Sequence, residues 1–81
     1  MTITLDKLAI DKTAKVRSIK LTNNLKKRLA DLGLVENSVI KKIYKSPFGD
    51  PCAYLIMGST IALRNNDCKN ILVDYETKGE E

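Results

Sequence analysis

A stripe of leucines between residues 22 and 34 is the clearest hydrophobic pattern in the chain. Leu25, Leu29 and Leu32 recur at the spacing of one face of an α-helix. Thr22 precedes the stripe as a helix-capping residue type, and Gly33 follows it as the residue that most readily takes the left-handed conformation at a helix end. The pattern predicts a helix over 23–32, with its leucines facing the core and the following leucine folded back onto Leu29.

Shorter apolar runs on both sides of this helix have the alternation or the β-branched content of strands. They predict strands over 14–20, 38–45, 52–57, 60–64 and 71–75. The alternation in the first run slips by one residue at Ser18–Ile19, which indicates a β-bulge. Between two later runs, Gly58–Ser59 predicts a two-residue hairpin turn.

Residues that favour turns separate these predicted elements. Thr4 can open a single helical turn over 5–8, and the segment 65–70 is polar enough for a short capped turn. Asn37 tolerates the positive φ that a turn after the helix requires. Two prolines enclose the loop Pro47–Pro51, and because each ring fixes its own φ, this loop should be stiff.

Short strands and one early helix leave two economical folds, a partly open barrel of SH3 or OB type and an α+β meander. We favour the barrel, because short strands enclose a core only where the sheet curls on itself, and curling also hides its edges. The predicted fold class is therefore mainly β: a small SH3-like barrel of about five short strands with one early α-helix. We expect a single domain over 1–75 and a disordered tail over 76–81, which has no apolar residue to anchor it.

The residue types that the chain lacks exclude several chemistries. Its 81 residues include no His, so there is no imidazole for acid–base catalysis, a serine triad or a metal site. Cys52 and Cys68 lack neighbouring ligands, and we expect free thiols with no metal or cofactor site. Since no nucleophile–base pair or phosphate-binding glycine loop is evident, we predict that the protein is not an enzyme.

The location is expected to be cytoplasmic. The longest apolar run, 52–57, is far shorter than the roughly 20 residues that span a bilayer. The N-terminal residues also lack a positively charged start followed by a hydrophobic stretch, so no secretory signal is expected.

Positive charge is concentrated in the first part of the chain. The net charge is +4, but residues 1–46 carry +7 and residues 47–81 carry −3. Such a distribution suits a nucleic acid, an anionic membrane surface or an acidic protein face, and charge does not choose among them.

Three blocks of sequence follow one another along the chain: Arg28–Leu34, then Pro47–Pro51 with Tyr54, then Gly58 followed by 61–64 and 71–73. Together they resemble the FeoA family of small cytosolic proteins of bacterial ferrous iron transport. The resemblance runs from about Leu5 to Val73. The sequence departs from the family pattern at Asp11, where glycine is usual, at Glu36–Asn37, where proline-glycine is favoured, and at Cys68, where alanine is common. Asp and Asn tolerate a positive φ, and Cys is a small apolar replacement, so the fold should persist.

This resemblance implies an SH3-like barrel that works beside FeoB, the membrane-embedded ferrous iron transporter whose cytosolic part is a GTPase. The expected function is that of an accessory protein that binds and regulates the GTPase part. The expected partner is therefore FeoB, with no cofactor and no nucleic acid.

Two segments are candidate contacts for that partner. A stiff loop that exposes Phe48 can enter a partner's pocket at a small ordering cost, although the ring could also fold down and cap the barrel. Arg28, beside the leucine stripe, either covers apolar surface or offers its guanidinium to a carboxylate. Arg64 is expected to pair with an internal acid, Asp67 or Asp74. The candidate partner-binding residues are Lys26, Lys27, Arg28, Pro47, Phe48, Gly49, Asp50 and Pro51.

Two other functions stay open at this point. A basic barrel can bind nucleic acid where aromatic side chains share one sheet face, and Tyr44 and Tyr54 are the candidate pair. Similar SH3-like domains are appended to iron-dependent repressors, which indicates a metal-sensing module as the other alternative, although no DNA-reading helix-turn-helix is evident.

Overall fold

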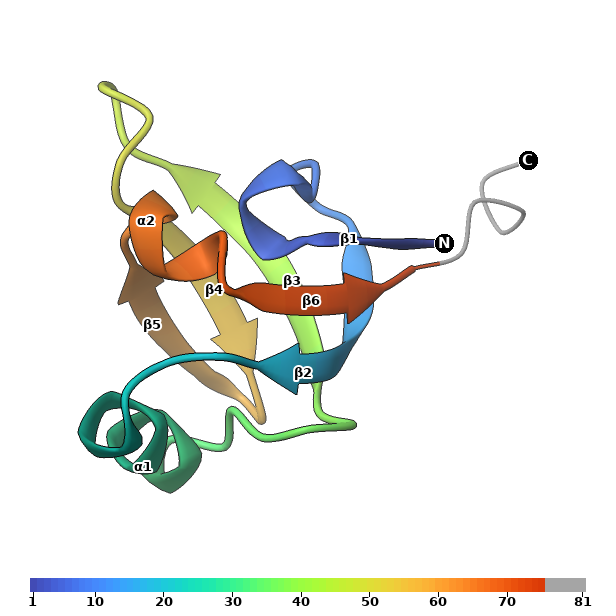
Figure 1. Ribbon diagram of the computed structural model, residues 1–81. Coiled ribbons are helices and arrows are strands. Elements are labelled where there is room, and N and C mark those ends of the chain that lie inside the picture. Colours follow the sequence, from blue (N-terminus) through green and yellow to red (C-terminus); the bar gives the residue numbers. More distant parts are fainter. Residues whose placement is uncertain (76–81) are drawn as a thin grey trace.

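One curled antiparallel sheet of six strands, in the order β1-β6-β2-β3-β4-β5, dominates the computed structural model, which describes residues 1–75 (Figure 1). The strands are β1 (Thr2–Thr4), β2 (Thr13–Ile19), β3 (Val39–Lys45), β4 (Cys52–Ile56), β5 (Ser59–Leu63) and β6 (Ile71–Asp74). The helices are the single turn η1 (Leu5–Lys7), α1 (Asn23–Asp31) and the short α2 (Asn65–Cys68). The tail predicted over 76–81 lies outside the described residues.

The mainly β class with one early helix is confirmed, and two short elements are added to it. Strand β1 was not predicted, because three residues are too few to show an alternation, and it is held by antiparallel pairing such as Ile3 with Val73. The capped turn predicted over 65–70 contains the helix α2. Among residues 1–75, no helix is both long and apolar enough to cross a membrane.

Two bulges let the sheet curl around its core. The register of β2 on β6 shifts between Val16 and Ser18, and that of β3 on β4 shifts between Lys42 and Tyr44. The extra residues are Arg17 and Ile43. A bulge bends its strand and increases the local twist, and Figure 1 shows β6 and β2 lying in front of β3, β4 and β5. The bulge in β2 is confirmed, one residue earlier than the pattern indicated.

Aliphatic side chains from β2 to β6 fill the space inside the curl, and Ile3 of β1 packs against them. Completely buried residues include Val16 of β2, Ile40 of β3, Ile56 of β4 and Val73 of β6. They alternate along their strands with more exposed residues, as a sheet with one buried face requires.

Both ends of helix α1 are capped by the residues that the sequence predicts, although the helix ends one residue earlier than expected. The Thr22 side chain accepts a hydrogen bond from the Leu25 amide at 3.4 Å. At the other end Gly33 has φ +100°, and the Leu34 amide donates to the Leu29 carbonyl at 2.9 Å. Together with the 2.9 Å bond from the Gly33 amide to Ala30, this is the Schellman closure.

The expectation that Leu32 faces the core is wrong. The helix ends at Asp31, and Leu32 occupies the C-cap, where φ −93° and ψ 0° leave the helical path. Its side chain is 46% exposed, whereas Leu34 is completely buried. Because the chain turns at Gly33, Leu34 and not Leu32 packs in the core.

The hairpin turn between β4 and β5 lies one residue earlier than predicted. Its central residues are Met57 and Gly58, with φ +51° and +80°, and Ser59 already pairs with Ile56. The turn lies close to the end of α1, because a Cβ on Gly33 would stand 2.7 Å from Met57 Cγ. A glycine at position 33 therefore serves both the helix end and this close approach.

The positive φ expected at the two departures from glycine is confirmed. Asp11 has φ +72° and Asn37 has φ +75°. The Asn37 amide also donates to the Val16 carbonyl at 2.8 Å, which fixes the connection between α1 and β3 against β2.

Candidate functional site

The loop between β3 and β4 holds its aromatic residue out to solvent. Phe48 is 96% exposed, so the alternative in which the ring caps the barrel is wrong. The backbone closes on itself through a 2.8 Å bond from the Gly49 amide to the Ser46 carbonyl and a 3.3 Å bond from the Ser46 amide to the Pro51 carbonyl. The loop is thus ordered without burying its most apolar side chain.

Helix α2 fixes this loop from the side. Asn65 Nδ2 donates to the Gly49 carbonyl at 2.8 Å, and the Asn65 amide donates to Asp50 Oδ1 at 3.0 Å. Cys52 Sγ lies 3.5 Å from the same Gly49 carbonyl and 3.7 Å from Asn65 Oδ1. Asp50 is therefore part of the loop's support. Sequence reasoning missed Asn65, because it lies 15 and 16 residues from its partners and its segment reads only as a turn.

The basic residues of α1 form the second candidate surface. Lys26, Lys27 and Arg28 are all exposed, and the nearby Leu29 is buried. Two shallow hollows, each of about 460 Å³, border the helix, and both are lined in part by Lys26 and Ala30. The exposed face of α1 is therefore positively charged, and shallow, open hollows border it.

The two candidate surfaces lie at opposite ends of the barrel. In Figure 1 the helix α1 lies at the lower end, and the loop that follows β3 projects at the upper end. Strand β3 joins the two ends, since it leaves the α1 side at Val39 and reaches the loop after Lys45. The structure brings the residues of each segment together but does not bring the two segments together.

A small polar cluster lies inside the barrel below the loop. Lys42 is only 6% exposed, and its Nζ donates to the Asp6 carbonyl at 3.2 Å and lies 5.9 Å from the centre of the Tyr54 ring. Cys68 Sγ lies 3.6 Å from Tyr54 Oη. Burial raises the pKa of the Cys68 thiol to about 11 and raises the pKa of the Tyr54 phenol still further. Both groups are neutral at physiological pH.

The described residues do not assemble a recognisable metal site. Cys52 and Cys68 are both free and buried. Within residues 1–75, no group of three or more Cys, Asp or Glu side chains converges. The cluster around Lys42 is joined by the hydrogen bonds of Lys42 with Asp6 and of Cys68 with Tyr54.

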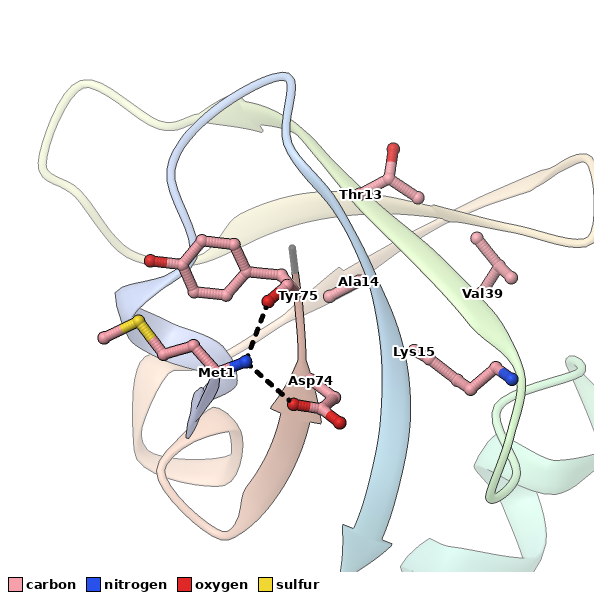
Figure 2. Close-up of a pocket in the computed structure, with 7 residues that line it drawn as sticks. All are labelled: Met1, Thr13, Ala14, Lys15, Val39, Asp74 and Tyr75. Carbon is pink, nitrogen blue, oxygen red and sulfur yellow. Dashed lines mark hydrogen bonds and ion pairs between the residues drawn. The ribbon is translucent and has the colours of Figure 1, made fainter. Parts of the chain in front are cut away.

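A third hollow, of about 420 Å³, lies beside the start of β2 (Figure 2). Met1, Val39, Asp74 and Tyr75 also line it. At its edge the amino group of Met1 donates to the Tyr75 carbonyl at 3.0 Å and lies 3.3 Å from Asp74 Oδ1. Arg17 Nη1 lies 3.1 Å from Asp74 Oδ2. Hydrogen bonds from the Met1 amino group and from Arg17 lower the pKa of the Asp74 carboxyl.

The expected pairing of Arg64 with Asp74 is wrong, since Arg17 and the Met1 amino group occupy that carboxylate. Within the described residues no ion pair joins Arg64 to Asp67 either. Arg64 immediately precedes α2, and its carbonyl caps that helix by accepting bonds from Asp67 and Cys68.

The two tyrosines proposed as a stacking pair do not share a face. Tyr54 is completely buried and Tyr44 is 56% exposed. Strict alternation would point Tyr44 inward with Lys42, but the bulge at Ile43 turns it outward. The sheet therefore presents no Tyr44–Tyr54 platform for bases.

A family model and several solved structures indicate one family. The model of the FeoA domain matches residues 3–75, whereas a comparison with curated proteins found no match. FeoA of Chlorobium tepidum is 30% identical, with a TM-score of 0.89 over 98% of this chain and 74% of that one. A FeoA-like protein of Clostridium acetobutylicum is also 30% identical, with a TM-score of 0.80 over 94% and 88%.

Two further structures extend the comparison. Stenotrophomonas maltophilia FeoA, complexed with zinc and described as a prokaryotic SH3 domain protein, is 31% identical with a TM-score of 0.73 over 91% of this chain and 89% of that one. IdeR of T. acidophilum shares the fold, with a TM-score of 0.80 at 24% identity over 93% of this chain and 34% of that one. The small SH3-like barrel is thereby confirmed. Because the family model covers nearly all of the described residues, the chain belongs to the FeoA family.

Proposed function

We propose that the protein is a cytoplasmic accessory module of bacterial ferrous iron transport that binds and regulates the cytosolic GTPase part of FeoB. Its role is binding, with no catalytic step of its own. Membership of the FeoA family supports the pathway, and the S. maltophilia relative is described as a candidate activating factor of ferrous iron transport. The observation that carries the docking claim is Phe48, which is 96% exposed on a loop that helix α2 holds in place.

The loop contact should contribute to affinity mainly through the ring of Phe48. Full burial of such a side chain is worth roughly 1.5–3 kcal/mol, which corresponds to about 10- to 100-fold in the dissociation constant. Because the bonds to Asn65 already order the loop in the free protein, little of this gain is spent on ordering it.

The basic face of α1 is proposed as a second, electrostatic contact. Lys26, Lys27 and Arg28 are exposed at the end of the barrel remote from Phe48. They would attract an acidic patch of the partner and raise the association rate, and this effect should weaken with salt. Because the two contacts lie far apart, they should act as separable contributions.

The alternatives have less support. The fold shared with IdeR at 24% identity does not indicate a metal-sensing role. The burial of Tyr54 removes the aromatic pair on which the nucleic-acid hypothesis depended.

The test is a titration of FeoB's cytosolic GTPase domain with this protein, with and without guanine nucleotide. Phe48→Ala should weaken binding about 10- to 100-fold at every salt concentration. Ile10→Ala is the matched control, since Ile10 is an exposed apolar residue that belongs to neither candidate segment, and its truncation should not change the affinity.

Charge is tested in the same assay. Changing Lys26, Lys27 and Arg28 together to Gln should weaken binding at low salt and less so at about 0.15 M, where the Debye length is about 8 Å. The control changes Lys7, Lys15 and Lys69, which are also exposed, to Gln. If neither Phe48→Ala nor the helix triple variant differs from its control, the docking surface lies elsewhere. If wild-type protein fails to bind the GTPase domain in any nucleotide state, the proposed function is wrong.

A further inference from the structure

The outer edge of β5 is an open strand edge. β5 is the last strand of the sheet and pairs only with β4. Figure 1 shows it at the margin of the molecule, between α1 and α2. Its sequence, Ser59–Leu63, contains no charged residue and no proline, although natural proteins commonly use such residues to block an exposed edge.

The hairpin geometry fixes which backbone groups face outward. In a two-residue hairpin the pair next to the turn is hydrogen-bonded, and here that pair is Ile56 and Ser59. Bonded and non-bonded pairs alternate along an antiparallel ladder. Ser59, Ile61 and Leu63 therefore turn their N–H and C=O groups toward β4.

Thr60 and Ala62 consequently turn both of their backbone groups away from β4. Both residues are exposed, and none of the backbone bonds that residues 1–75 make outside helices and strand pairs involves them. A donor and an acceptor at each of the two positions are thus available to an added strand.

We propose that this edge pairs antiparallel with the same edge of a second copy of the chain, about a two-fold axis through Ile61. Thr60 of one copy then lies opposite Ala62 of the other. The two residues exchange both N–H···O=C bonds, and the symmetry-related pair does the same. Every outward group of the strand finds a partner in this register.

Neighbouring registers satisfy fewer of these groups. If the two-fold axis passes through Thr60 instead, Ala62 must pair with Gly58 of the other copy. Gly58 lies in the hairpin turn with φ +80° and is not in an extended conformation. If the axis passes through Ala62, Thr60 must pair with Arg64 of the other copy. The Arg64 carbonyl already accepts hydrogen bonds from the Asp67 and Cys68 amides, both at 3.0 Å. The register centred on Ile61 is therefore favoured by the backbone alone.

The side chains and charges also suit a second copy. In this register no two charged residues lie directly opposite, since Arg64 falls opposite Gly58. The strand from Ser59 to Leu63 is uncharged. The exposed side chains of Thr60 and Ala62 are small, so they do not hinder the approach of the second strand. The pairing is isologous, so it stops at a dimer, whereas pairing of β5 with the three-residue edge β1 would continue into a chain of molecules.

The first test is amide hydrogen exchange by NMR, together with sedimentation, over a range of protein concentrations. The Thr60 and Ala62 amides should become more protected as the concentration rises and a dimer forms, while the Ile61 amide, bonded to β4, is protected throughout. Because each copy carries a net charge of +4, added salt should strengthen this association, in contrast to the salt effect expected for FeoB.

The second test uses a variant pair at one position. Ala62→Pro removes the outward N–H but none of the bonds to β4, and should weaken dimerisation about tenfold or more. Ala62→Val keeps the N–H and should dimerise like the wild type. Unchanged Ile61 protection in both variants verifies the fold. The inference is overturned if Thr60 and Ala62 exchange independently of concentration, if the protein stays monomeric at millimolar concentration, or if Ala62→Pro dimerises as well as Ala62→Val.

Discussion

Replacing Asn65 by Ala isolates the support that α2 gives to the Phe48 loop. The change removes the 2.8 Å bond from Asn65 Nδ2 to the Gly49 carbonyl and the weaker contact of Asn65 Oδ1 with Cys52 Sγ. It retains the backbone bond from the Asn65 amide to Asp50. The loop should therefore loosen without detaching.

The magnitude follows from two opposing terms. A hydrogen bond of this kind contributes about 0.5–1.5 kcal/mol, and a partly buried carbonyl left with only a weak thiol donor adds up to about 1 kcal/mol. Alanine is the better helix former, which returns at most about 0.7 kcal/mol. The hydrogen-bond term is the larger, and Asn65→Ala should lower the free energy of unfolding by about 1 kcal/mol.

The assay is urea denaturation, with exchange of the Gly49 amide as a local measure. Asn66→Ala is the control, because Asn66 is the next residue of α2 and its side chain is exposed. That change should leave stability unchanged or raise it slightly. Equal stability of the two variants, with equal Gly49 exchange, would refute the assignment of Asn65 as the loop's support.

Three other outcomes can be measured on the same protein. Leu29→Ala should cost about 2–5 kcal/mol in urea denaturation, whereas Leu32→Ala should cost under about 1 kcal/mol; equal losses would show that the helix face is misassigned. The Cys68 thiol, buried and with its pKa raised to about 11, should react with a disulfide reagent at pH 8 only when the protein unfolds, and rapid labelling of native protein would contradict this burial. Because the pKa of Asp74 is lowered in the folded state, its stabilisation is present at neutral pH and lost as the pH falls below about 4, so Asp74→Asn should unfold with a shallower acid dependence than the wild type.

The elements that the sequence predicts well are those decided by neighbouring residues. Helix α1 needs only its cap at Thr22, its buried Leu29 and the left-handed Gly33, all within one short segment. The positive φ of Asn37 likewise follows from its own short polar side chain. The residue types that signal these features lie within a few positions of one another, so a short stretch of sequence is enough to predict them.

The features that the sequence does not predict depend on contacts between distant segments. Leu32 fits the helical stripe, yet the chain turns at Gly33, and Leu34 is buried in the core where Leu32 was expected. Asn65 shows no local sign of holding a loop 15 and 16 residues away. The separation of Phe48 from the basic face of α1 also becomes visible only once β3 spans the barrel between them.

The bulges in β2 and β3 bear on how this family can vary in length. Each inserts one residue, Arg17 or Ile43, without changing which side of the sheet the following residues occupy relative to their partners. Removing Ile43 would leave Tyr44 opposite Ala53, with a straighter strand. Relatives that lack one residue here are therefore expected to keep the same interior, and an alignment gap at position 17 or 43 would mark a change of curvature and leave the core intact.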